Sequence, residues 1–126
     1  MKDFKNIWKG NKMKGKPIDE LKIGDSAQIT RRVTEEVIND FAKATGDFNQ
    51  LHIDQSYAEK TIFKGRIAHG MLSLGIISAV LGNILPGYGT IYISQEVRFV
   101  SPVRLGDEIT AKVELIEMIT LVQIKF

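Results

Sequence analysis

The sequence predicts an α+β domain in which one apolar helix packs against an antiparallel sheet. Residues 68–85 are apolar on almost every face, which is typical of a helix enclosed by other structure. Residues 90–100 and 108–117 follow it and alternate apolar with polar side chains, as half-buried strands do. A shorter alternating segment, Ser26–Arg32, predicts a strand before the helices.

Helices are expected between the first strand and the apolar helix. Thr34 suits an N-cap, two glutamates follow it where the helix dipole favours negative charge, and Gly46 suits the C-terminal stop. Asp54 is the expected cap of a further short helix that runs to Lys60. The sequence therefore predicts a helix of about three turns and then a short one.

Two similar phrases each precede an expected strand. Residues 22–25 read Lys-Ile-Gly-Asp and residues 104–107 read Arg-Leu-Gly-Asp. Glycine and aspartate are turn formers, so we interpret the pair as one type of turn used twice rather than as an internal repeat. A last apolar strand is expected at 119–126.

Length and composition bound the class of protein. The chain has 126 residues, enough for one compact domain, and its 44% hydrophobic and 25% charged residues are those of an ordinary soluble chain. The absence of cysteine excludes a disulfide framework, a thiolate zinc site and a cysteine nucleophile, and it fits a cytoplasmic location. Polar residues and glycines interrupt 68–85, so no membrane span is expected there.

Positive charge is concentrated at the N-terminus. Residues 1–16 hold six lysines and one aspartate, a balance of +5, whereas the remainder holds eleven basic and fourteen acidic side chains, a balance of −3. We interpret 1–16 as a basic, solvated extension and 17–126 as a single domain. The extension has no arginine cluster, so no nucleic-acid partner is expected, and no signal-peptide core follows it.

Chemistry is predicted just beyond the first long helix. The chain lacks a dinucleotide fingerprint, a phosphate loop and a nucleophile elbow. Asp47 and His52 remain, and a carboxylate beside an imidazole can hold a water and move its proton. On spacing alone this signal is weak, because such an aspartate is usually a turn former and a lone histidine is usually an ordinary core or surface residue. His69 is the only other histidine and is expected to be structural, so no metal site is expected.

A family resemblance joins these segments. Residues 41–54 (FAKATGDFNQLHID), then AHGML at 68–72 and VRFVSPV at 97–103, resemble the MaoC-like (R)-specific enoyl-CoA hydratases. The resemblance implies a hot-dog fold, an antiparallel sheet wrapped around one buried central helix. It also implies hydration of trans-2-enoyl-CoA to (R)-3-hydroxyacyl-CoA, or the reverse dehydration, without a cofactor.

The resemblance also implies roles for individual residues. Asp47 and His52 match the catalytic pair, and Asn49 would orient the pair or its water. Gly70 matches the glycine whose backbone N–H polarises the thioester carbonyl. Ser78 falls at a serine position associated with the site, although close packing of a helix rich in small residues explains it equally well.

Departures from the family pattern leave alternatives open. Gln50 stands where the family usually has proline, so the loop before His52 is expected to be less rigid. The family's domains continue with one more strand after the one expected at 119–126, so the last strand is expected to be missing. A homodimer that binds an acyl-CoA thioester is expected. The alternatives are an acyl-CoA thioesterase of the same fold and a non-catalytic acyl-thioester-binding or structural subunit.

Overall fold

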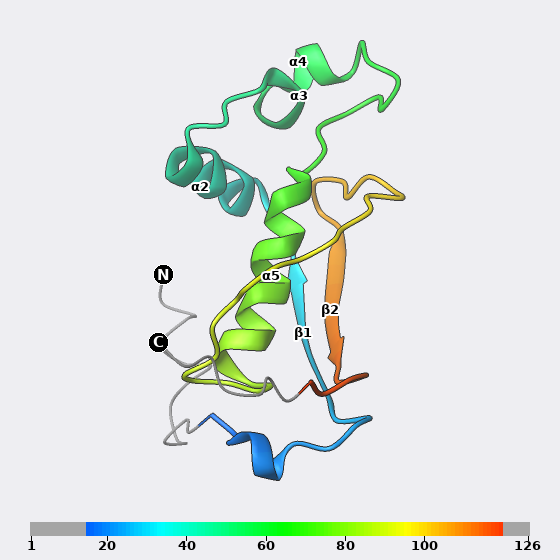
Figure 1. The fold of residues 1–126 in the computed structure, drawn as a ribbon. Helices are drawn as coiled ribbons and strands as arrows, with labels where there is room; N and C mark the ends of the chain where they lie inside the picture. Colours follow the sequence, from blue (N-terminus) through cyan, green and yellow to red (C-terminus); the bar gives the residue numbers. More distant parts are fainter. Residues whose placement is uncertain (1–14, 120–126) are drawn as a thin grey trace.

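A long helix forms the axis of the molecule in the computed structural model, which describes residues 15–119 (Figure 1). Strands β1 and β2 run along one side of helix α5, α2 lies beside its N-terminal end, and α3 and α4 lie beyond that end (Figure 1). The elements in chain order are η1 (Ile18–Glu20), β1 (Ser26–Arg32), α2 (Glu35–Thr45), α3 (Gln50–Ile53), α4 (Gln55–Ala58), α5 (Gly70–Asn83) and β2 (Glu108–Glu114). The α+β prediction is confirmed.

The two strands form one antiparallel ladder. Their register pairs Ser26 with Glu114 at one end and Arg32 with Glu108 at the other. The predicted alternation of β2 is confirmed, because its apolar side chains pack against α5, but the strand ends three residues earlier than 117.

The interpretation of one turn used twice is confirmed. In each copy the aspartate side chain accepts a hydrogen bond from the first residue's N–H, with 3.0 Å between Lys22 N and Asp25 Oδ2 and 2.8 Å between Arg104 N and Asp107 Oδ2. The glycines between them have φ of +94° and +92°, which side chains rarely tolerate. The copies lead into β1 and β2.

The predicted caps are formed. Thr34 Oγ1 accepts from Val37 N–H at 3.2 Å, and Gly46 ends α2 with a left-handed φ of +77°. Asp54 Oδ1 accepts from Tyr57 N–H at 3.0 Å and caps α4, which ends at Ala58 rather than at 60. Between residues 15 and 119, no helix combines the length and apolar character that crossing a membrane requires.

The prediction of a buried central helix is confirmed, although one stripe of α5 stays exposed. Ile76 and Val80 are buried against Ala111 of β2, and Leu72 joins a second cluster with residues of α2. The exposed stripe includes Met71, Gly75 and Ser78. The sheet covers one side of the helix, and residues 90–100 run across the other side (Figure 1), where the Phe99 ring lies against Gly70.

The prediction of a strand at 90–100 is wrong. This segment runs obliquely across the side of α5 away from the sheet (Figure 1), and no backbone hydrogen bond joins 91–102 to other described residues. A strand needs a neighbouring strand with which to form a hydrogen-bonded ladder, and residues 15–119 supply none here. Ile91, Ile93 and Val100 are each more than 80% exposed. The strand expected at 119–126 lies, except for Ile119, outside the described residues.

Candidate functional site

The loop between α2 and α3 carries Asp47, and α3 itself carries His52. Two hydrogen bonds between residues close in the chain shape this loop. Asp47 Oδ1 accepts from Asn49 N–H at 3.2 Å, and Asn49 Oδ1 accepts from Leu51 N–H at 3.0 Å. Asn49 thereby caps α3, the helix that carries His52. Its side-chain oxygen bonds the backbone of this helix, so any influence on the pair acts through the loop. Gln50 is the exposed first residue of α3.

The half-buried His52 ring is held by a backbone carbonyl. Its Nδ1 lies 2.8 Å from Ile67 O. A carbonyl oxygen only accepts, so Nδ1 carries the proton in the neutral ring and Nε2 keeps a lone pair. This tautomer leaves a base at Nε2, as water activation requires.

His69 forms its hydrogen bond through the other ring nitrogen, Nε2. The residue is 3% exposed, and its Nε2 lies 3.0 Å from Asp47 O, so Nε2 carries the proton. The buried Nδ1 has no hydrogen-bond partner among residues 15–119. The His52 and His69 rings stack with centroids 4.0 Å apart, and Phe41 lies 4.8 Å from the His69 ring. His69 therefore ties the Asp47 backbone to the start of α5.

Asp47, His52 and His69 could together hold a metal ion, since each offers a ligand atom within 4.8 Å of the others. Two imidazoles that bind one ion point their in-plane lone pairs at a common centre. These rings instead stack with an interplanar angle of 30°. The expectation of a site without metal stays a prediction.

A pocket of about 510 Å³ opens at the N-terminus of α5 and is lined by His52, His69 and Gly70. Gly70 is the first residue of α5, and its N–H meets no acceptor within residues 15–119. The Phe99 ring covers the glycine so closely that a Cβ on Gly70 would lie 2.9 Å from Phe99 Cε1. The site thus offers a free helix N–H beside an aromatic wall.

Ser78 lies apart from this group. It is exposed two turns further along α5, in a second hollow of about 650 Å³ that also contains Gly75 and Leu74. Met71 lines both hollows. The structure therefore brings Asp47, His52 and Gly70 to one end of α5 and leaves Ser78 in the neighbouring hollow.

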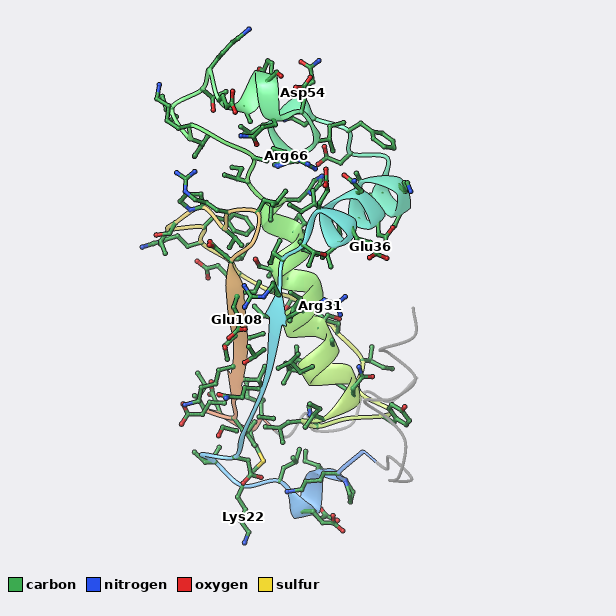
Figure 2. The ribbon with its side chains drawn as sticks, turned by 180° about the vertical axis from the view of Figure 1, so that it is seen from behind. Lys22, Arg31, Glu36, Asp54, Arg66 and Glu108 are labelled. Atoms are coloured by element: carbon green, nitrogen blue, oxygen red, sulfur yellow. The ribbon has the colours of Figure 1, made fainter. Side chains whose placement is uncertain are left out.

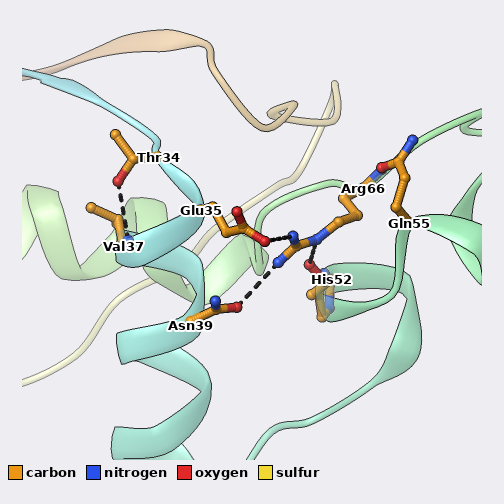
Figure 3. Close-up of polar contacts among 7 residues, drawn as sticks. All are labelled: Thr34, Glu35, Val37, Asn39, His52, Gln55 and Arg66. Carbon is orange, nitrogen blue, oxygen red and sulfur yellow. Dashed lines mark hydrogen bonds and ion pairs between the residues drawn. The ribbon is translucent and has the colours of Figure 1, made fainter.

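Sequence reasoning missed Arg66 and Phe99. Arg66 is buried, and its Nε donates to His52 O at 2.6 Å (Figure 3). A view from behind shows Arg66 with Asp54 at one end of the molecule and Lys22 at the other (Figure 2). One signal was present in the sequence, because a single arginine borders the apolar run that begins at residue 67. A charge in that place calls for buried partners.

Comparisons with known proteins identify the family of the chain. A family model described as MaoC like domain matches residues 20–126. The chain is 50% identical over 95 residues to an (R)-specific enoyl-CoA hydratase of Rhodospirillum rubrum, covering 75% of this chain and 66% of the relative. It is 43% identical over 101 residues to a 3-hydroxybutyryl-CoA dehydratase of Methylorubrum extorquens, covering 80% and 64%.

A solved structure shows the same likeness in three dimensions. R-hydratase PhaJ1 of Pseudomonas aeruginosa, unliganded, superposes with a TM-score of 0.80 at 45% identity, covering 83% of this chain and 68% of that one. The expectation of the hot-dog fold is confirmed.

Proposed function

The chain belongs to the MaoC-like domain family, and from this premise we propose that it catalyses (R)-specific hydration of trans-2-enoyl-CoA to (R)-3-hydroxyacyl-CoA, or the reverse dehydration. The observation that carries the proposal is that His52 and Gly70, with its free N–H, line one pocket, and that a carboxylate oxygen of Asp47 lies within 4.8 Å of a ring nitrogen of His52. The chain spans 66% and 64% of the length of these two relatives, whose names describe these reactions.

The geometry suits addition of water to a conjugated thioester. The thioester oxygen accepts from the Gly70 N–H, where the positive end of the α5 dipole favours the negative charge that develops. A water held by the Asp47 carboxylate and His52 Nε2 gives its hydroxyl group to the β-carbon, and a proton reaches the α-carbon as the double bond is lost. The carbonyl accepts the electrons, so no cofactor is needed.

The test uses crotonyl-CoA and the purified chain. We expect loss of enoyl absorbance, an (R)-3-hydroxy product and no free CoA, whereas a thioesterase releases CoA and a binding subunit gives neither change. Asp47→Asn and His52→Gln should each lower kcat by about two orders of magnitude or more with the fold intact by circular dichroism. Near-normal turnover in both variants would refute the mechanism.

Asp54→Asn is the matched control for Asp47→Asn. It changes a carboxylate to an amide in the same loop region, and the carboxylate it changes caps α4. Asparagine caps helices as well as aspartate does, so turnover should stay at the wild-type level.

A homodimer is part of the proposal. The exposed apolar side chains of 91, 93 and 100 and the open sheet edges support it, because natural chains cover such surfaces. Light scattering should find a dimer, and a stable, active monomer would contradict it. We further propose a cytoplasmic location, supported by the absence of cysteine.

A further inference from the structure

Arg66 is the only buried lysine, arginine, aspartate or glutamate in residues 15–119. Each of its guanidinium nitrogens has a different acceptor (Figure 3). Nε donates to His52 O at 2.6 Å, Nη1 to Glu35 Oε1 at 2.7 Å and Nη2 to Asn39 Oδ1 at 3.1 Å. The guanidinium therefore joins α2 to the backbone of α3 at His52.

An ion pair alone does not account for this placement. The Glu35 side chain is 67% exposed, whereas that of Arg66 is 6% exposed. Burying a guanidinium costs free energy unless all of its donors have acceptors. Since Glu35 stays exposed, it could pair with an arginine on the surface without this cost. What burial adds is the contact with the His52 carbonyl.

The segment that contains Arg66 also holds the imidazole. His52 Nδ1 donates to Ile67 O, and Ile67 N–H donates to Leu51 O at 3.4 Å. Residues 66 and 67 thus hold His52 by its carbonyl, its ring and the preceding residue. Helix α2, which anchors the other side of Arg66, leads directly to Asp47.

We propose that Arg66 is a positioning residue that holds the His52 backbone so that the ring keeps its Nδ1–H tautomer and turns Nε2 toward Asp47. Its importance for turnover rests on the proposed function. The planar guanidinium meets three acceptors in fixed directions, which a lysine ammonium on this backbone cannot reproduce.

Kinetics provide the first test. In Arg66→Met we expect kcat to fall about 10- to 100-fold, because small displacements of a catalytic group have effects of this size, while KM stays within about threefold. The kcat of Arg66→Lys should lie between that of Arg66→Met and that of the wild type. A folded Arg66→Met variant with wild-type kcat, or with only KM raised, would overturn the inference.

Arg32→Met is the matched control. Arg32 also bonds a carbonyl and a carboxylate, Gly106 O and Glu108 Oε2, but it is exposed, and its partners lie in the turn before β2 and in β2 rather than in α3. Its replacement should leave kcat unchanged.

The second test needs no turnover, so it separates this inference from the proposed function. The chain has only two histidines, so a long-range ¹H–¹⁵N spectrum recorded where both rings are neutral assigns each tautomer. Wild type should show one Nδ1–H ring, His52, and one Nε2–H ring, His69. Arg66→Met should move the His52 signals toward an average of both tautomers and leave His69 unchanged.

If wild type is inactive, these spectra alone decide, and unchanged His52 signals in folded Arg66→Met overturn the proposal. If Arg66→Met does not fold, the same spectra are recorded for Glu35→Ala. This substitution removes one acceptor of Arg66, and the fold should tolerate it because the Glu35 side chain is largely exposed. The same His52 change at smaller amplitude supports the proposal, and no change refutes it.

Discussion

Replacing Gly70 by alanine adds one methyl group at the start of α5, directly against the Phe99 ring. The new Cβ would lie 2.9 Å from Phe99 Cε1 and 3.1 Å from two further ring carbons. Carbon atoms in good contact are about 3.5 to 4.0 Å apart, so the ring must move by roughly 0.5 to 1 Å. Phe99 is 57% exposed and can move outward, so the free energy of unfolding should change by less than about 1 kcal/mol.

Turnover should respond more strongly than stability. The methyl group and the displaced ring change the pocket beside the Gly70 N–H, where the thioester oxygen is proposed to bind. Displacement of a bound substrate by about 1 Å can cost up to roughly 100-fold in rate. We expect kcat/KM for crotonyl-CoA hydration to fall at least about tenfold.

Gly82→Ala is the control on the same helix. Apart from the adjoining residues and the backbone of the helix itself, no atom lies within 4 Å of the position that its Cβ would take. Alanine should stabilise the helix by about 0.5 to 1 kcal/mol and raise Tm by about 2 to 5 °C, with turnover unchanged. Thermal melts and the hydration assay measure both quantities. If Gly70→Ala matched Gly82→Ala in stability gain and kept wild-type kcat/KM, the steric reasoning at Phe99 would be refuted.

Three further predictions concern stability and are checked by denaturant unfolding. Ile38→Ala removes a fully buried side chain and should cost about 2 to 5 kcal/mol, so a loss below 1 kcal/mol would contradict the assigned core. Thr34→Ala removes the α2 cap and should cost about 1 kcal/mol, whereas Thr34→Ser should cost almost nothing. Gly24→Ala and Gly106→Ala place a side chain at positive φ and should each cost about 1 to 2 kcal/mol, and similar losses in both would support one turn used twice.

The features predicted correctly from sequence are those whose causes lie within a few residues. The Thr34 cap, the left-handed Gly46 stop and the two Gly-Asp turns each depend on a hydrogen bond or a φ value set by adjacent residues. The approach of Asp47 to His52 belongs with them, because Asp47 lies in the short loop before α3 and His52 lies in α3, which Asn49 caps.

The features that sequence could not decide depend on partners far along the chain. Residues 90–100 alternate apolar with polar side chains as a strand does, but alternation shows only which face each side chain would occupy. A strand also needs a neighbouring strand that accepts and donates its backbone hydrogen bonds, and residues 15–119 do not supply one. The same holds for the histidines. The Ile67 carbonyl, 15 residues along the chain, selects the tautomer of His52, and the Asp47 carbonyl, 22 residues away, selects that of His69. Arg66 donates to the His52 carbonyl from 14 residues away. Chain folding, and not local propensity, brings such acceptors within hydrogen-bond distance, so only the tertiary structure shows which nitrogen of each ring is left to do chemistry.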